Sequence, residues 1–321
     1  MNYAAFRRPF VALLLGAALA QPAFATTPPA APPVAAVADN PAAHPSFTVR
    51  VVGKGRPVIL IPGLTCPGAV WDETVARYQS RYRCHVLSLA GFGGVPAASG
   101  SPTAGFLPVV RDQLLTYIKT QKLDRPAVIG HSLGGFMGLW LSTTQPDAIG
   151  PLVILDSLPF LAAIQNPATT VETARPMAEG MRKQAAGKMP MAQQRQMVAS
   201  MVTDTARQSL VARWGQASEP ASVAQAMYEM YTTDLRGDLG VVRQPALVLG
   251  TWAAYQPYGA TLASTRAIFA AQYTKLPQHR IEMSEAGKHF IMYDDTAWFF
   301  QQTDAFLQAN YAGKANYVGK K

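Results

Sequence analysis

The chain has 321 residues, of which 49% are hydrophobic and 15% are charged. This composition supplies enough apolar surface for a sizeable core and excludes an intrinsically disordered chain. The formal charge is +9, but it comes without a dense lysine and arginine run and without a nucleic-acid motif. We therefore expect no DNA or RNA partner and attribute the excess to solubility or weak attraction to anionic surfaces.

The first 25 residues are organised like a secretory signal peptide. Arg7 and Arg8 form a basic start, and residues 10–20 form an apolar stretch that is short for a membrane span. Ala23-Phe24-Ala25 fits the rule for a cleavage site, so we expect cleavage after Ala25. We predict a periplasmic or secreted protein with no stable membrane anchor after cleavage; the alternative is an anchor that stays uncleaved.

Residues 26–46 are rich in proline and alanine. Proline fixes φ and removes a backbone donor, so this segment is predicted to be a disordered tether. Short apolar runs and longer helical stretches then alternate from residue 47 onward. The predicted strands of this first part lie at 47–52, 58–62, 85–89, 127–130 and 152–156. The helices between them are expected at 70–81, within 103–122, and at 133–144.

The alternation stops after residue 156. Residues 157–239 show no convincing strand and are rich in the helix formers Met, Gln, Ala and Arg, so they predict an inserted helical cap. The remaining elements are a strand at 246–250, a helix at 262–273, a strand at 280–283 and a helix with Asp295 as its N-cap. We expect an α/β fold: a mostly parallel sheet with helices on both faces, a core of 47–156 and 240–312, and a tail of 313–321.

Only two cysteines are present, Cys66 and Cys84. We expect Cys66 to follow the carboxyl end of one strand and Cys84 to precede the next parallel strand. The two positions would then lie about 16 Å apart on opposite edges of the sheet. That separation is beyond disulfide reach, so we predict two unpaired thiols and no metal site built on them.

The sequence Gly130-His131-Ser132-Leu133-Gly134 stands between a predicted strand and a predicted helix. A serine in such a tight turn has its hydroxyl raised above the sheet, and the start of the helix stabilises negative charge beside it. The flanking glycines allow the close backbone approach that the turn needs. The alternative is a glycine-rich turn with an idle serine.

Two further motifs stand before and after this one in the chain: Ile61-Pro62-Gly63-Leu64 and Gly287-Lys288-His289-Phe290. A known family has all three motifs in this order. Together the three motifs resemble the α/β-hydrolase fold family, in its serine hydrolase and esterase branch with an inserted cap, over residues 47–312. The resemblance implies Ser132 as nucleophile and His289 as general base. It also implies an oxyanion hole made of the backbone N–H groups of Leu64 and Leu133. No cofactor and no metal is indicated.

The other histidines are weaker candidates for the base. His44 lies in the expected tether, and His85 and His279 are expected at the opposite edge of the sheet. His131 is expected to pack beneath the turn rather than to react. His289 follows the last predicted strand, where the family has its base, and a neutral imidazole there can accept the serine proton.

The triad acid is where the chain departs from the family pattern. The family usually has it beyond the strand at 246–250, but residues 250–255 contain no carboxylate. Asp156, at the carboxyl end of the strand that follows the nucleophile helix, is our candidate, since some members carry the acid there. Alternatives are that Asp156 caps the next turn, that Asp294 or Asp295 serves instead, or that a dyad works without an acid.

These residues predict transfer of an acyl group from a small-molecule substrate, with carboxylic esters ranked ahead of lactones, thioesters and amides. The cap and the aromatic residues Trp252, Tyr255 and Tyr258 are expected to line an apolar pocket. The alternative function is a non-catalytic, ligand-binding member of the fold, prompted by the absence of a carboxylate after Gly250.

Overall fold

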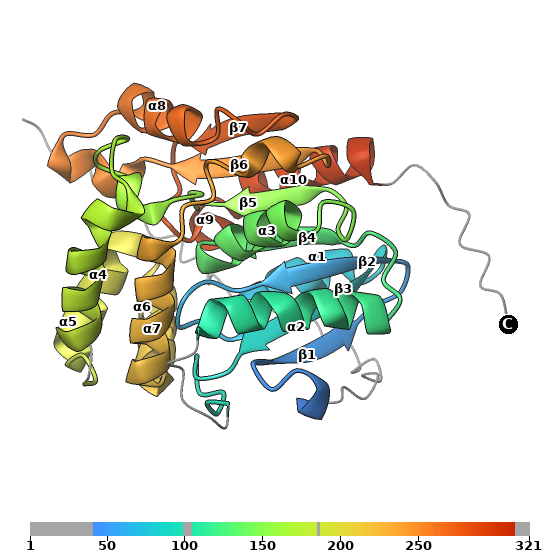
Figure 1. Ribbon diagram of the computed structural model, residues 1–321, viewed down its shortest axis with the longest axis horizontal. Helices are drawn as coiled ribbons and strands as arrows, with labels where there is room; N and C mark the ends of the chain where they lie inside the picture. Colours follow the sequence, from blue (N-terminus) through green and yellow to red (C-terminus); the bar gives the residue numbers. More distant parts are fainter. Residues whose placement is uncertain (1–40, 99–104, 185–186, 312–321) are drawn as a thin grey trace, which may run out of the picture. The chain divides into compact units, whose positions relative to one another are not determined.

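A seven-stranded sheet with the order β1-β3-β2-β4-β5-β6-β7 is the centre of the structure. The computed structural model describes residues 41–98, 105–184 and 187–311 (Figure 1). The strands are β1 (Phe47–Val52), β2 (Arg56–Ile61), β3 (Tyr82–Leu89), β4 (Ala127–His131), β5 (Leu152–Leu155), β6 (Ala246–Thr251) and β7 (His279–Ser284). β1 runs antiparallel to β3, and the other neighbouring strands run parallel. The predicted fold class is confirmed.

The burial of the strands explains their order. Every residue of β4, β5 and β6 is buried, as expected for central parallel strands covered on both faces. β1 instead alternates buried and exposed residues along its first four positions, which suits an edge strand with one face in water. The predicted edge strand at 47–52 and the buried strands beside it therefore have the expected environments.

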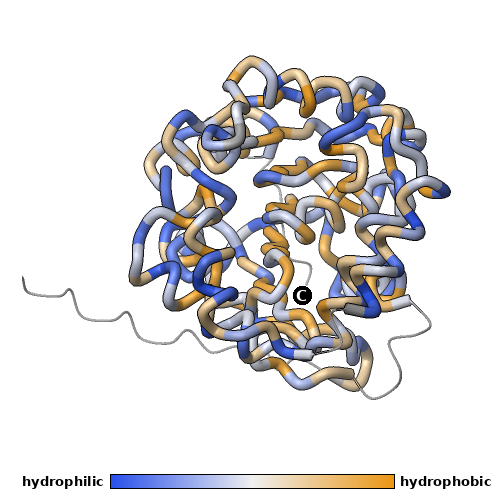
Figure 2. Tube along the Cα trace, turned by 90° about the vertical axis from the view of Figure 1, so that its left-hand side faces the viewer, coloured by the Kyte–Doolittle hydropathy of each residue, from blue (hydrophilic) through white to orange (hydrophobic). Residues whose placement is uncertain are grey.

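Helices cover both faces of the sheet (Figure 1). One face packs against α2 (Phe106–Thr120), α3 (Leu133–Thr144) and α8 (Leu262–Gln272). The other packs against α1 (Asp72–Tyr78), α9 (Ile291–Asp294) and α10 (Thr296–Asn310). Successive residues of β2 serve opposite faces: Ile59 and Ile61 belong to the first core, and Val58 and Leu60 to the second. Figure 2 shows hydrophobic stretches in the middle of the trace and many hydrophilic ones at its periphery.

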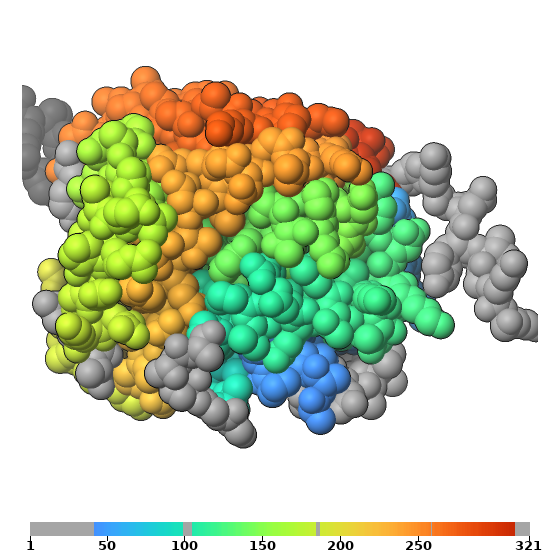
Figure 3. Space-filling model, in the orientation of Figure 1, coloured from blue at the N-terminus to red at the C-terminus, as the bar shows by residue number. Residues whose placement is uncertain are grey.

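Among the described residues, four α-helices lie between β5 and β6, within the segment expected to form a cap. They are α4 (Val171–Gln184), α5 (Met191–Met201), α6 (Thr205–Ala217) and α7 (Pro220–Thr232). α4 packs on α7, and α5 packs on α6. Asp204 caps α6 by accepting a hydrogen bond from the N–H of Arg207 at 2.8 Å. In Figure 3, α4 in yellow-green and α7 in gold cover one side of the α/β core.

The segment between β2 and β3 differs from its expected form. A short 3-10 helix (Gly68–Trp71) precedes α1, and α1 ends at Tyr78 rather than Arg81. The N–H of Arg81 donates to the carbonyl of Tyr78 at 2.9 Å, and this tight turn lets β3 begin at Tyr82. Cys84 therefore lies inside a strand and not before it.

The cysteine prediction nevertheless holds. In the part of the chain that the structure describes, Cys66 and Cys84 are both free and buried. Burial raises the pKa of each thiol to about 12. Both side chains belong to the core on the α1 and α10 face of the sheet, where they fill space beside apolar neighbours.

Both ends of the described region bear on the sequence predictions. The end of the expected tether is packed: His44 and Ser46 are buried, and the Ser46 N–H donates to Oε1 of Gln113 at 3.0 Å. The tether prediction is therefore wrong for residues 41–46, because polar groups there find partners on the domain.

The expected signal peptide, the tether up to residue 40, and the tail at 313–321 lie outside the described residues. Among the described helices, none has both the length and the apolar character needed to cross a membrane.

Candidate active site

Ser132 occupies the sharp turn between β4 and α3, as the motif predicts. Its φ of 52° and ψ of −117° are unusual for a residue with a side chain. The turn is held at both ends: the Ser132 N–H donates to the carbonyl of Leu155 at 2.8 Å, and the Ser132 carbonyl accepts from Phe136 at 3.0 Å. Within the described part of the chain, the Ser132 hydroxyl makes no hydrogen bond.

The two flanking glycines are needed for close backbone contacts. A Cβ atom on Gly130 would lie 2.1 Å from the carbonyl oxygen of Gly134, and one on Gly134 would lie 2.1 Å from that of Ile61. Neither distance is possible between real atoms. The first turn of α3 can therefore reach the end of β2 only because these positions carry no side chain.

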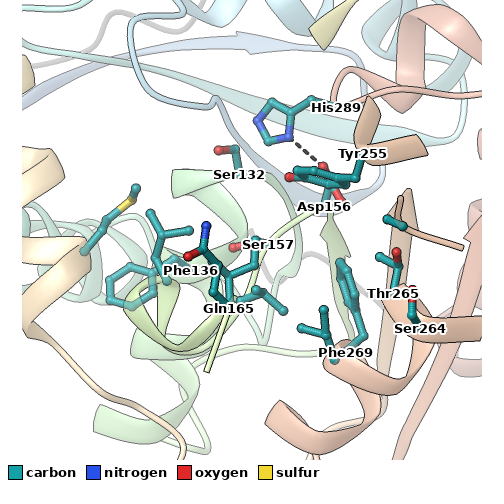
Figure 4. A pocket seen from close by; sticks show the side chains of 16 residues that line it. Ser132, Phe136, Asp156, Ser157, Gln165, Tyr255, Ser264, Thr265, Phe269 and His289 are labelled. Atoms are coloured by element: carbon teal, nitrogen blue, oxygen red, sulfur yellow. Dashed lines mark hydrogen bonds and ion pairs between the residues drawn. The ribbon is translucent and has the colours of Figure 1, made fainter. Parts of the chain in front are cut away.

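His289 and Asp156 meet across a long stretch of sequence. The Nδ1 atom of His289 lies 2.6 Å from Oδ2 of Asp156, and the other oxygen, Oδ1, accepts a 3.2 Å hydrogen bond from the N–H of Thr251. Figure 4 shows this pair beside Ser132, with the second imidazole nitrogen on the side of the ring towards the serine. The three predicted triad residues are thus brought together at the carboxyl edge of the sheet, where Ser132 follows β4, Asp156 follows β5 and His289 follows β7.

The usual position of the acid, after β6, is filled differently. Thr251 ends β6, and its hydroxyl donates to the carbonyl of Gly287 in the loop that carries His289. Its N–H group supports the carboxylate of Asp156 from the neighbouring strand. The Asp156 side chain therefore faces the imidazole and does not simply cap the turn that follows it.

The other acidic candidates have different partners. Asp295 takes the N-cap position of α10, but its carboxylate accepts from the hydroxyl of Ser284 at 2.7 Å instead of capping its own helix. Asp294 accepts from the backbone N–H groups of Thr203 at 2.9 Å and Lys288 at 3.1 Å. Both residues thus hold the loop around His289 without touching the imidazole.

The loop that carries His289, residues 285–290 between β7 and α9 (the base loop), is also bonded to the last turn of α5. Lys288 Nζ donates to the carbonyl of Ala199 at 2.9 Å, and the N–H of Phe290 donates to that of Met201 at 3.2 Å. Sequence reasoning did not find these contacts, because nothing local to either segment signals them. They make the cap part of the support for His289.

The predicted oxyanion hole lies against the nucleophile. Leu133 is the first residue of α3, so its N–H has no acceptor within the helix. The loop with Gly63 and Leu64 is close by, since a Cβ atom on Gly63 would lie 3.3 Å from the Cβ atom of Ser132. This is where two donors are needed for an oxyanion, and their role remains a prediction.

His131 is buried beneath the turn, as expected, but it has a contact that the sequence did not signal. Its Nε2–H donates to the carbonyl oxygen of His289 at 2.9 Å. Burial and the nearby imidazole of His289 lower the pKa of His131 well below its usual value, so the ring is neutral. His85 and His279 lie elsewhere: His85 bonds the hydroxyl of Tyr117 at 2.7 Å, and His279 bonds the carbonyl of Leu276 at 2.6 Å.

A cavity of about 490 Å³ opens beside Ser132, Asp156 and His289 (Figure 4). Its walls are mostly apolar and come from α3, the segment after β5, the cap helix α7 and α8: Phe136, Leu158, Leu161, Met230, Ile268 and Phe269. Tyr255 lines it as expected, whereas Trp252 is not among the lining side chains. Among the described residues, no lysine or arginine faces the cavity. Its size and lining suit an uncharged small molecule.

Among the described residues, no three or more His, Cys, Asp or Glu side chains are grouped so that they could hold a metal ion. The model of the alpha/beta hydrolase family matches residues 58–302. The chain belongs to the alpha/beta hydrolase family. The matched segment of this alpha/beta hydrolase begins in β2, includes all three motifs and ends within α10.

Named relatives of this alpha/beta hydrolase include esterases. It is 34% identical over 111 residues to a pimeloyl-[acyl-carrier protein] methyl ester esterase of Aliivibrio salmonicida, covering 35% of this chain and 40% of the relative. It is 25% identical over 213 residues to the esterase of that name in Nitrosomonas europaea, covering 64% and 79%. The chain thus spans about two fifths of the length of the first of these relatives.

Solved structures show the same fold. An enol-lactonase from Burkholderia xenovorans has a TM-score of 0.65 at 17% identity, with 82% of this chain and 96% of that chain covered. An esterase from Exiguobacterium antarcticum has a TM-score of 0.68 at 13% identity, with 82% and 95% covered. At these identities the likeness establishes the architecture of this alpha/beta hydrolase and nothing finer.

Proposed function

We propose that the chain is an exported serine hydrolase that cleaves carboxylic esters through an acyl-enzyme. The observation that carries the proposal is the juxtaposition of Ser132, in a strained turn, with a His289 imidazole that is hydrogen-bonded to Asp156, all three beside one cavity. A serine next to an oriented imidazole is the arrangement that acyl transfer requires.

The reaction follows from the positions of these groups. Ser132 Oγ bonds to the ester carbonyl carbon while its proton passes to His289 Nε2, and Asp156 stabilises the imidazolium through Nδ1. The N–H groups of Leu64 and Leu133 stabilise the oxyanion. His289 then protonates the departing alcohol, and a water molecule, deprotonated by the same imidazole, attacks the acyl-enzyme to release the acid and free the serine.

The cavity supports an uncharged, largely apolar substrate. Ionisable side chains in its lining are the triad members Asp156 and His289 and the hydroxyl of Tyr255. Burial and the charge of Asp156 raise the pKa of Tyr255, so that hydroxyl stays neutral. A carboxylate or phosphate on the buried part of a substrate would find no lysine or arginine among the described lining residues and would be disfavoured. The esterase names of the relatives favour esters over the other acyl bonds that this machinery can cleave.

Labelling with a fluorophosphonate probe tests the enzyme against the alternative, a non-catalytic ligand-binding member. We expect the wild-type protein to be labelled once and Ser132→Ala not at all, with hydrolysis of aryl and alkyl esters lost in parallel. An unlabelled wild-type protein, or equal labelling of both, contradicts the proposal. The alternative was considered because no carboxylate follows β6. The carboxylate of Asp156, hydrogen-bonded to the imidazole, removes that reason and so supports the proposal that the protein is an enzyme.

Export is supported by the first 25 residues, with Arg7 and Arg8, an apolar stretch and the Ala23-Phe24-Ala25 site. We expect the mature protein to begin at Thr26 and to appear in the periplasmic or extracellular fraction of cells that express the full chain. N-terminal sequencing of that material checks the cleavage site. Full-length protein retained in the membrane fraction would instead favour the uncleaved anchor.

A further inference from the structure

We propose that His131 is a positioning residue that holds the main chain at His289 in place and so sets the approach of the base to Ser132. The role rests on the proposed function, because it belongs to the same hydrolytic reaction. His131 stands next to the nucleophile in sequence, at the end of β4. Its side chain contacts the base loop, and it is not among the described residues that line the cavity.

Two kinds of contact join His131 to the base. The Nε2–H group donates to the carbonyl oxygen of His289 at 2.9 Å, which links residues 158 positions apart. The two imidazole rings also pack together, with centroids 4.6 Å apart and planes at 51°. The Phe290 ring lies 4.7 Å from the His131 ring. The main chain and the side chain of the base are therefore both supported by one residue.

The other edge of the ring faces the predicted oxyanion loop. A Cβ atom on Gly63 would lie 2.8 Å from Nδ1 of His131, so the imidazole fills the space beside this glycine. Leu64, a predicted oxyanion donor, is the next residue. In the described part of the chain, Nδ1 has no hydrogen-bond partner, which fits a ring whose single proton is on Nε2. His131 thus contacts the base loop and the oxyanion loop at once.

Histidine suits this place because the donor must be uncharged. The residue is only 1% exposed, and a buried lysine or arginine would bring a positive charge next to the imidazole that has to accept a proton. A neutral imidazole donates to the carbonyl without opposing the imidazolium that forms on His289 during acyl transfer. A side-chain amide of the same reach is the natural substitute.

His131 does not act as a second base. Its Nε2 proton is committed to a carbonyl oxygen, and within the described residues the cavity lining does not include it. Changes at His131 should therefore act on the rate of the chemical step, kcat, and leave the substrate KM nearly unchanged. A general loosening of the fold would instead lower the fraction of active protein and the thermal midpoint.

The test compares His131→Gln with His131→Leu, two side chains of similar size that differ in the donor. We expect the Leu variant to lose roughly tenfold or more in kcat, with KM within about twofold, and the Gln variant to stay within about threefold of wild type. The rate of fluorophosphonate labelling should fall in parallel with kcat. His279→Leu is the control, because His279 also bonds a backbone carbonyl but begins β7, at the opposite edge of the sheet.

Several outcomes overturn the positioning role while Ser132→Ala still abolishes activity: a wild-type kcat in the Leu variant, or equal losses in folded Leu and Gln variants. If the Leu variant does not fold, the shorter amide of His131→Asn replaces it, and an Asn variant as active as Gln overturns the role.

Nitrogen NMR of ¹⁵N-histidine-labelled wild-type protein gives an independent reading. We expect a neutral, Nε2-protonated His131 at pH 7; an Nδ1-protonated or charged ring there contradicts the contact. A wild-type protein that reacts with no probe or ester instead refutes the proposed function itself.

Discussion

Nδ1 of His289 lies 2.6 Å from Oδ2 of Asp156, although 133 positions separate the two residues in the chain. Asp156 follows β5 and His289 follows β7, with β6 between these strands in the sheet. The acid therefore reaches past one intervening strand, and the N–H of Thr251 at the end of that strand supports its second oxygen. The imidazole is fixed in the tautomer that leaves Nε2 free to accept a proton.

Replacement of the acid should disable the reaction without removing the fold. In Asp156→Asn the amide no longer holds the required tautomer, so we expect kcat to fall by about a thousandfold or more. Steady-state kinetics with an aryl ester measure the loss. Asp294→Asn is the matched control, since Asp294 bonds Thr203 and Lys288 rather than the imidazole, and it should cost only a few-fold. The reverse ranking would show that the acid is misassigned.

Filling the cavity should change substrate preference and not catalysis itself. Ile268 lines the cavity from α8, so Ile268→Trp takes up part of its volume of about 490 Å³. We expect kcat/KM for an octanoyl ester to drop roughly tenfold or more, while that for an acetyl ester stays within about twofold. Val241→Trp, at a site that is 50% exposed, is the control. If the ratio of kcat/KM for the octanoyl ester to that for the acetyl ester did not change, the acyl group of the substrate would have to bind outside this cavity.

The two cysteines should be unreactive in the folded protein. Burial raises the pKa of Cys66 and of Cys84 to about 12, so at pH 8 both are protonated thiols, whereas the thiolate is the form that attacks disulfide reagents. We expect almost no colour with an aromatic disulfide reagent in buffer, and two thiols per chain in denaturant. Fast reaction of either cysteine without denaturant would contradict the burial.

Acid should weaken the fold through buried histidines. Burial, and to a smaller extent Arg83, lower the pKa of His85 from 6.5 to about 4. The unfolded chain therefore binds a proton between these pH values and the folded chain does not. The free energy of unfolding accordingly falls as pH drops from 6.5 to about 4, by roughly 3 kcal/mol for one such histidine. The lowered pKa of His131 acts in the same direction.

Denaturant unfolding of wild type and His85→Gln at pH 7 and pH 4.5 measures this effect. We expect the variant to lose clearly less stability on acidification than the wild-type protein does. Val241→Gln, at a site that is 50% exposed and has no titratable side chain, is the control and should retain the wild-type dependence. Identical slopes for wild type and His85→Gln would show that His85 does not titrate differently in the two states.

Local patterns in the sequence predicted the elements that local physics determines. The helix after Ser132 has both of its expected ends, Leu133 and Thr144, because the glycine-rich turn starts it and no other element alters it. The region before β3 was harder, since the turn at Arg81 depends on where β3 finds its partners. The sequence therefore misplaced the start of that strand and the setting of Cys84.

In the candidate site, too, the sequence predicted the residues but not the long-range contacts that hold them in place. Ser132 was predicted from a motif of five residues, whereas His289 and Asp156 were predicted from the chain order that the resemblance to the family implies. The contacts that hold these residues cross long stretches of sequence: His131 to the carbonyl of His289, and Lys288 to that of Ala199. A single sequence carries no periodic or compositional signal for such pairs, so only a folded structure reveals them.

The backbone at Ser132 has one more consequence. A φ of 52° with a ψ of −117° is comfortable for glycine and costs a residue with a side chain on the order of 1–3 kcal/mol. Substitution by glycine would relieve that cost and delete the hydroxyl in the same step. Thermal robustness and turnover therefore pull in opposite directions at position 132, and a variant library screened for heat resistance alone would drift towards inert proteins there.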